Sequence, residues 1–169
     1  MSKDDFIQDD LYDEEDEDTL SNRYLAFHLG GEDYGIEIRY VTEIVGVQKI
    51  TEVPDMPEFV KGVVNLRGQV IPVMDMRLRF HMEPRAYDER TCVVVVNLDG
   101  MFVGLIVDTV QEVREIPEES VSPPPQLSKS EKSRYILGMG KVGDEVKILL
   151  NLCKLLREEE LASLQEGGA

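Results

Sequence analysis

The chain has 169 residues, 42% of them apolar and 31% charged, which is typical of a soluble globular domain or of two small barrels that share a core. Its formal net charge of −16 argues against a nucleic-acid binder, because phosphates must be neutralised by clustered Lys and Arg. No apolar run approaches the roughly 18–20 residues that cross a bilayer, and no secretory signal is apparent, so the cytoplasm is the expected compartment.

Residues 1–21 form the first predicted segment, an acidic tail. Residues 1–20 contain ten acidic side chains and, as their only basic side chain, Lys3. Such a run of like charge repels itself and buries too little apolar surface to become ordered, so we expect it to be disordered. Docking on a basic partner and calcium binding are the alternatives, although the spaced glycine of a calcium loop is missing.

From Tyr24 onward the pattern is that of short strands joined by tight turns. Apolar residues alternate with polar ones, and glycine-containing pairs interrupt them. Four hairpins are expected, in the sequences YLAFHLGGEDYGIEI, VVNLRGQVIPVMD, CVVVVNLDGMFVGLIVD and KVGDEVKILL. Ser122–Ser133, with three consecutive prolines, is expected to be an extended connector. The one convincing longer helix is expected at Asn151–Leu164.

The chain also repeats itself. YGIEIRYVTEI (34–44) matches VGLIVDTVQEV (103–113) at a shift of 69, which aligns Gly35 with Gly104. KGVVNLRGQVIPVMDM (61–76) matches LGMGKVGDEVKILLNL (137–152) at a shift of 76. About five strands per copy suit closure into a small barrel. We therefore expect a mainly β fold of two tandem barrels within residues 22–169, roughly 34–90 and 91–150 with strands exchanged at the ends; a single sandwich is the alternative.

No catalytic constellation, metal site or cofactor motif is found in the sequence. His28 and His81 have no nucleophile or metal-ligand spacing near them, and Cys92 and Cys153 fit neither a zinc site nor a disulfide framework. Asp75 ends a strand, where capping a short helix explains it. We expect no enzyme activity and no cofactor. An enzyme or a ligand-binding module, the alternatives, would need a pocket with converging polar groups.

Four stretches of the chain resemble the CheW family of bacterial chemotaxis coupling proteins. They are YLAFHLGGEDYGIEIRYVTEIVG, PDMPEFVKGVVNLRGQVIPVMDMRLRF, VVVVNLDGMFVGLIVDTVQEV and RYILGMGKVGDEVKILLNLCKLL, and the NLRG hairpin is the most specific part. The resemblance covers about 140 residues, from Tyr24 to Leu164. It implies two five-stranded SH3-like β-barrels with short helices and a C-terminal helix at 151–164. An aspartate is frequent in the family where this chain has Asn151.

The function implied by this resemblance is that of a non-catalytic adaptor and scaffold in chemotaxis signal transduction. Such an adaptor joins the cytoplasmic tip of methyl-accepting chemoreceptors (MCPs) to the regulatory domain of the histidine kinase CheA. It would be cytoplasmic, at membrane-associated receptor arrays, and would reach the membrane only indirectly through the receptors. A relative that serves a different receptor cluster, or an isolated relative of CheV, remains compatible with the same motifs.

The resemblance also implies two docking surfaces. The receptor-binding residues are expected to be Val41, Glu43, Arg67, Gly104 and Val113. An arginine fork would fix the orientation of a receptor helix there. The alternatives are core packing for Val41 and Val113, and a solvated turn charge for Arg67, whose counterpart in the second copy is Gly143. The kinase-binding residues are expected to be Val53, Met56, Pro57 and Phe59.

Overall fold

The computed structural model describes residues 21–124 and 134–156, which contain mostly strands. The strands are β1 (Arg23–Leu29), β2 (Glu32–Glu37), β3 (Val41–Gly46), β4 (Val60–Leu66), β5 (Gln69–Asp75), β6 (Cys92–Leu98), β7 (Met101–Val107), β8 (Thr109–Glu115), β9 (Val121–Ser122), β10 (Ile136–Val142) and β11 (Glu145–Leu150). The short helices are η1 (Ile38–Tyr40), α2 (Met76–Arg79), η2 (Glu118–Ser120) and α3 (Leu152–Leu156). No helix in these ranges is long and apolar enough to cross a membrane.

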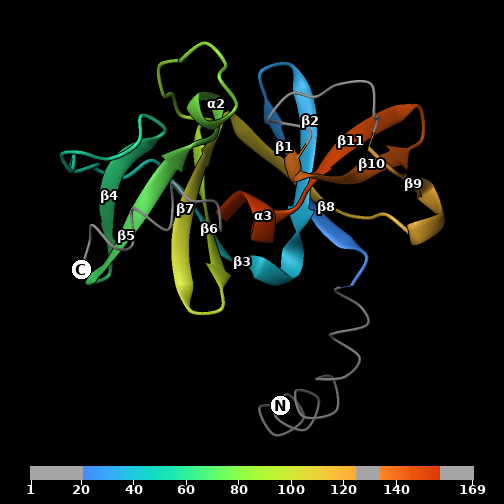
Figure 1. Ribbon diagram of the computed structural model, residues 1–169, viewed down its shortest axis with the longest axis horizontal. Helices are drawn as coiled ribbons and strands as arrows, with labels where there is room; N and C mark the ends of the chain where they lie inside the picture. Colours follow the sequence, from blue (N-terminus) through green and yellow to red (C-terminus); the bar gives the residue numbers. More distant parts are fainter. Residues whose placement is uncertain (1–20, 125–133, 157–169) are drawn as a thin grey trace, which may run out of the picture.

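The strands form two sheets that lie side by side, with α3 between them (Figure 1). Sheet A has the order β8-β1-β2-β11-β10-β9, and sheet B has the order β3-β6-β7-β5-β4. The β2–β11 and β5–β7 pairs are parallel, and the remaining pairs are antiparallel. The predicted mainly β fold is confirmed, and the two predicted five-stranded barrels correspond to these two sheets; sheet A has a sixth strand, the two-residue β9.

The two sheets are built alike, as the sequence repeat predicts. Replacing β3, β6, β7, β5 and β4 by their counterparts gives β8, β1, β2, β11 and β10, the order of sheet A. Gly35 pairs with Leu149 in one sheet, and Gly104 pairs with Val73 in the other, at the two shifts found in the sequence. The first hairpin of each repeat therefore lies among the last strands of the other. Because each sheet takes strands from both repeats, the barrel boundaries at 34–90 and 91–150 stay a prediction.

The largest hydrophobic cluster fills the space between the two sheets. It combines buried side chains of β1, β2, β6 and β7 with three leucines of α3. A row of aromatic rings crosses it: Phe27, Tyr34, Phe80 and Tyr135 have successive centroid separations of 5.7, 6.0 and 6.5 Å. Offset aromatic contacts of this kind add to the stabilisation from area burial. Each sheet also has a separate, smaller cluster on its other face, the one turned away from the cluster between the sheets; we call this its inner face.

The two α-helices, α2 and α3, begin at equivalent capping residues. The side chain of Asp75 accepts hydrogen bonds from the N–H groups of Arg77 and Leu78 at the start of α2. Asn151 Oδ1 accepts from the N–H of Lys154 in α3. The predicted helix at Asn151–Leu164 thus begins where expected. Residues 157–164 of it lie outside the described residues, as do residues 1–20 of the acidic tail predicted over 1–21.

Candidate functional site

The NLRG motif forms the tight turn between β4 and β5. Arg67 and Gly68 occupy its centre with φ angles of 52° and 90°, and Asn65 Oδ1 accepts a hydrogen bond from the N–H of Gly68 at 2.8 Å. Two positive φ angles define the turn that matches the twist of paired strands. Asp99 and Gly100 repeat these angles in the next hairpin, as the sequence predicts. The turn leaves the Arg67 side chain 71% exposed at the hairpin tip.

The Arg67 guanidinium forms an ion pair with Glu43, in which Nη2 donates to the carboxylate. Glu43 belongs to β3, one edge of sheet B, whereas Arg67 follows β4, the opposite edge. The sheet therefore curls until its two edges meet at this corner. An exposed ion pair stabilises a fold by roughly 0–1 kcal/mol, so Arg67 contributes little to the stability of this one.

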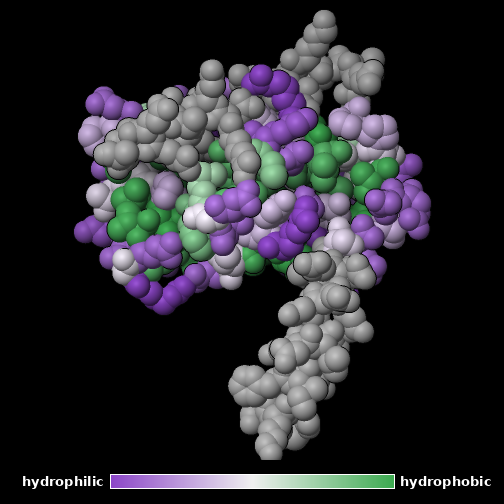
Figure 2. All heavy atoms as spheres, turned by 60° about the horizontal axis from the view of Figure 1, so that its bottom comes forward, coloured by the Kyte–Doolittle hydropathy of each residue, from purple (hydrophilic) through white to green (hydrophobic). Residues whose placement is uncertain are grey.

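Two apolar residues close in sequence to this ion pair have side chains that reach the solvent. Ile44, next to Glu43, is 42% exposed, and Val70, three residues after Arg67, is 63% exposed. We call Glu43, Ile44, Arg67 and Val70 the sheet B corner. Apolar side chains interrupt the hydrophilic surface in separate patches (Figure 2), and a corner of this composition suits an apolar helix with carboxylates along its flank.

The other predicted receptor residues lie elsewhere. Val41 is half-buried at the start of β3 and packs against the cluster between the sheets. Val113 is exposed, but it belongs to β8 of sheet A, opposite Leu25. Gly104 is buried in the middle of sheet B. The structure brings Glu43 and Arg67 together, and the assignment of the whole set to one receptor site stays a prediction.

Sequence reasoning missed Ile44 and Val70. The alternating burial of β3 puts Ile44 on the exposed face, although its sequence, VTEIVG, does not alternate between apolar and polar residues. Their repeat counterparts, Val113 and Val146, are also exposed, at 47% and 49%. Each sheet therefore carries a pair of exposed apolar side chains at equivalent positions; the repeat alignment relates these positions, but their exposure is seen only in the fold.

Gly104 is required by packing. A Cβ atom there would lie 2.7 Å from Val93 Cγ1 and 2.9 Å from Val73 Cγ1. We expect Gly104→Ala to lower the free energy of unfolding by about 1–3 kcal/mol, the usual cost of overpacking. Chemical denaturation measures the loss, and adding Val93→Ala should recover part of it because the two sites are coupled. Weaker receptor binding with unchanged stability would instead make Gly104 a contact residue.

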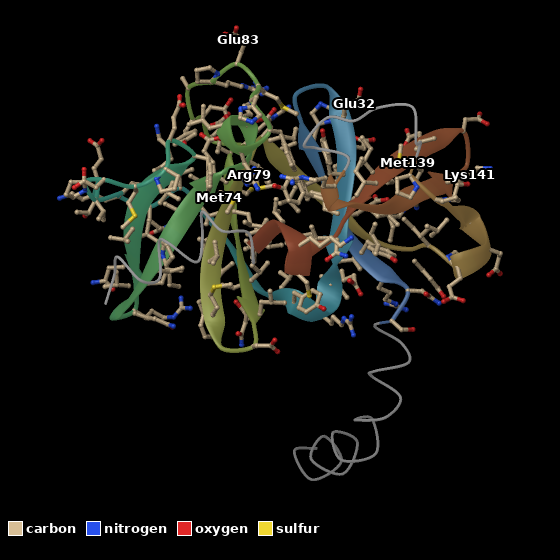
Figure 3. All side chains as sticks on the ribbon, in the orientation of Figure 1. Glu32, Met74, Arg79, Glu83, Met139 and Lys141 are labelled. Carbon is tan, nitrogen blue, oxygen red and sulfur yellow. The ribbon has the colours of Figure 1, made fainter. Side chains whose placement is uncertain are left out.

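The predicted kinase residues lie between β3 and β4, in the segment 47–59. Val53, Met56, Pro57 and Phe59 are each half-buried. Phe59 is the best anchored, since its carbonyl accepts from the N–H of Asp75 at 2.7 Å. Its ring also lies 4.9 Å from the guanidinium carbon of Arg79, which is 4.5 Å from the ring of Tyr135. Arg79 thus projects from α2 between the two sheets (Figure 3) and holds one end of this segment.

A polar cluster that the sequence analysis did not predict lies near α2. Arg77 forms a two-pronged pair with Asp108, with Nε to Oδ1 at 2.8 Å and Nη2 to Oδ2 at 2.7 Å. The N–H of Gly30 donates to the same carboxylate at 3.0 Å, and Arg85 approaches it to 3.4 Å. Glu32, at the start of β2, and Glu83, in the loop after α2, accordingly lie on the same side of the molecule (Figure 3).

This cluster has a structural explanation. Burial opposes the charge of Asp108, but hydrogen bonds from Arg77 and Gly30 outweigh it and hold the pKa of the carboxyl below its usual range. Asp75, another carboxylate near α2, caps this helix and accepts a hydrogen bond from the hydroxyl of Tyr87 at 2.6 Å. Burial and that hydrogen bond raise the pKa of Tyr87. Within the described ranges, no three His, Cys, Asp or Glu side chains are grouped to hold a metal ion.

Comparison with known proteins gives consistent matches along the chain. A family model described as "CheW-like domain" matches residues 23–160. The chemotaxis protein CheW of Klebsiella aerogenes is 39% identical over 145 residues, covering 86% of this chain and 87% of that protein. The chemotaxis protein CheW of Treponema pallidum is 33% identical over 144 residues, covering 83% and 85%. The solved scaffolding protein TtCheW from Thermoanaerobacter tengcongensis has a TM-score of 0.75 at 35% identity, over 82% of this chain and 94% of that one.

Proposed function

The chain belongs to the CheW-like family of chemotaxis scaffold proteins, and from this we propose that it is a non-catalytic adaptor joining chemoreceptors to the kinase CheA. In this role it binds the cytoplasmic tip of a chemoreceptor at one surface and the regulatory domain of the kinase at another. It works in the cytoplasm, at receptor arrays, and touches the membrane only through the receptors.

The sheet B corner is the observation that carries this proposal. Arg67 is 71% exposed at a hairpin tip, and Val70, three residues later at the start of β5, is exposed as well. A receptor tip is a helical hairpin that offers apolar residues flanked by carboxylates and amides. Ile44 and Val70 fit the apolar stripe, and the planar guanidinium suits a carboxylate or carbonyl of the same helix.

For the kinase we propose the segment between β3 and β4. Val53, Met56 and Pro57 keep part of their apolar surface in solvent, while Phe59 anchors the segment through Arg79. The segment thus offers a partner an apolar surface whose end is anchored by Phe59. Because it is a different segment from the Arg67 turn, two partners can be bound by separate groups of residues.

Titration of the purified chain against a receptor signalling fragment and against the regulatory domain of the kinase tests the adaptor role directly. Two saturable interactions that do not compete are expected, with no chemical turnover. If neither partner is retained at micromolar concentrations, the proposed function is wrong.

Arg67→Ala is expected to weaken receptor binding by about 1–3 kcal/mol, which is roughly 5- to 150-fold in Kd, because a charge-assisted hydrogen bond is lost. Calorimetric titration with each partner measures the effect. Kinase binding and the unfolding free energy should change by under about 1 kcal/mol, since the side chain is exposed. Lysine should restore only part of the binding, because it lacks the planar fork.

The matched control for this variant is Arg39→Ala. Arg39 is also an exposed arginine, 54% accessible and paired with Glu37 at 3.1 Å, but it lies outside the sheet B corner. Its removal should leave receptor affinity unchanged. A loss for Arg39→Ala equal to that for Arg67→Ala would mean that general charge, rather than the corner, attracts the receptor.

A further inference from the structure

The inner faces of the two sheets differ in chemistry although their strands correspond. In sheet B the inner cluster contains seven buried apolar residues, with Ile71 from β5 among them and Phe102 from β7 packed against it. In sheet A the corresponding cluster has three buried residues, Tyr24, Ile116 and Leu149. At the shifts of the repeat, the counterparts of Ile71 and Phe102 are Lys147 and Asp33.

Lys147 and Asp33 form the centre of a charged cluster. The Lys147 side chain is 6% exposed, and its Nζ donates to Asp33 Oδ2 at 3.0 Å and to Glu145 Oε1 at 3.2 Å. His28 Nδ1 lies 3.0 Å from Asp33 Oδ1, to which the side-chain amide of Gln111 also donates at 3.4 Å. Lys147 shares a strand face with Leu149, two residues on, so the cluster occupies the inner face of the sheet.

This charged cluster spans four strands that follow one another in sheet A. Gln111 comes from β8, His28 from β1, Asp33 from β2 and Lys147 from β11. The β2–β11 junction between the repeats has two register pairs, against three at the equivalent junction of sheet B. On the inner face of sheet A, the β2–β11 junction is therefore held by two backbone pairs and an ion pair. At the β7–β5 junction of sheet B, apolar side chains take the place of the ion pair.

We propose that the charged cluster is an electrostatic latch, which holds sheet A closed more weakly than apolar side chains hold sheet B. Sheet A therefore opens first, while sheet B stays closed. A buried ion pair loses most of its Coulomb energy to desolvation, whereas the apolar contacts it replaces stabilise without that cost. Regions with fewer buried apolar contacts open at lower free energy than the rest of a protein.

The charges of the latch fix how it depends on pH. His28 and Lys147 together hold the pKa of Asp33 below its usual value of 3.8, against the effect of burial. Burial opposes the charge of Lys147, but hydrogen bonds to Asp33 and Glu145 outweigh it and raise the pKa of the amine. The stabilisation is therefore full at neutral pH. It is lost as the pH falls through the pKa of Asp33 or rises through that of Lys147.

The strands of the latch also carry exposed apolar side chains. Val146, exposed between Glu145 and Lys147, belongs to β11, and Val113, exposed two residues after Gln111, belongs to β8. A partner that binds these side chains holds the strands that the latch joins and so resists opening of sheet A. This link to partners rests on the proposed adaptor function, whereas the opening of sheet A can be measured on the chain alone.

Amide hydrogen exchange on the full chain at neutral pH tests the latch. In the wild type, amides of β2 and β11 are expected to exchange at least about tenfold faster than their counterparts in β7 and β5. Asp33→Asn removes a negative charge and leaves Glu145 as the one carboxylate bonded to Lys147, so it should speed exchange in sheet A further without changing sheet B. The double variant Asp33→Phe with Lys147→Ile copies the corresponding side chains of sheet B. It should reduce the difference in amide exchange rate between the two sheets.

Two results would overturn the proposal. Equal exchange rates at equivalent positions of the two sheets in the wild type would show that the molecule opens as one unit. Equal acceleration of both sheets by Asp33→Asn would show that the cluster supports global stability and does not act as a latch. Neither result depends on a receptor or a kinase, so the adaptor function is tested separately.

Discussion

Replacing Asp108 with alanine is expected to lower the free energy of unfolding by about 3 kcal/mol, the effect of removing one partner of a buried ion pair. The side chains of Asp108 and Arg77 are 7% and 17% exposed, so the guanidinium would be left largely buried without its carboxylate. The N–H of Gly30 would lose its acceptor as well. Since Gly30 belongs to the β1–β2 turn, the loss would also free sheet A from sheet B at this end.

Urea denaturation of Asp108→Ala measures the loss, and Arg85→Ala is its control. Arg85 is 49% exposed and approaches the same carboxylate to 3.4 Å, so its removal should cost under about 1 kcal/mol. The pKa of Asp108 is lowered, so its contribution is present above 3.8 and is lost as the pH falls through the lowered pKa. The variant should therefore show a shallower loss of stability in acid. A loss below about 1 kcal/mol at neutral pH would contradict the prediction.

Gly62→Ala is expected to destabilise the fold by about 3 kcal/mol or more, because backbone atoms block the new side chain. A Cβ at Gly62 would lie 2.1 Å from the carbonyl oxygen of Thr51, and its φ of 145° is strained for any other residue. Thr51 and Val63 exchange two hydrogen bonds of 2.8 Å beside this glycine, which tie the segment between β3 and β4 to the edge of sheet B. Thermal and urea unfolding measure the effect.

Gly46→Ala is the matched control for that variant. Gly46 also lies in a strand of sheet B, but nothing stands within 4 Å of a Cβ built there. Its replacement should be neutral or slightly stabilising, because alanine restricts the unfolded chain more than glycine does. Similar losses at the two positions would mean that glycine is needed for chain flexibility, and the close approach of Thr51 would no longer explain Gly62.

Local pattern predicted much of the fold. The turns at Arg67–Gly68 and Asp99–Gly100 follow from the glycine each contains, because a positive φ suits glycine. Gly35 and Gly104 aligned across the repeat and occupy equivalent close approaches in the two sheets. Asp75 was recognised as a cap because the signal for capping lies within a few residues of the helix it caps.

The sequence could not predict contacts that depend on how the sheets curl and exchange hairpins. Glu43 and Arg67 lie at opposite edges of sheet B, so only its curvature brings them together. Lys147 and Asp33 are 114 residues apart and meet because a hairpin of one repeat enters the sheet of the other. Ile44 and Val70, two of the five exposed large apolar side chains among the described residues, were likewise missed because exposure is a property of the finished surface.

The exchange of hairpins has a consequence for the newly made chain. Sheet B is built from one uninterrupted stretch, Val41–Val107, and can form as soon as that stretch has left the ribosome. The β1–β2 hairpin emerges earlier, yet Tyr34 must wait for Ile148, 114 residues later. At translation rates of roughly 5–20 residues per second, the delay is on the order of ten seconds. During that time Leu25, Phe27 and Leu29 lack the leucines of β11 and α3 that complete their cluster, so this hairpin keeps apolar surface exposed until the end of synthesis.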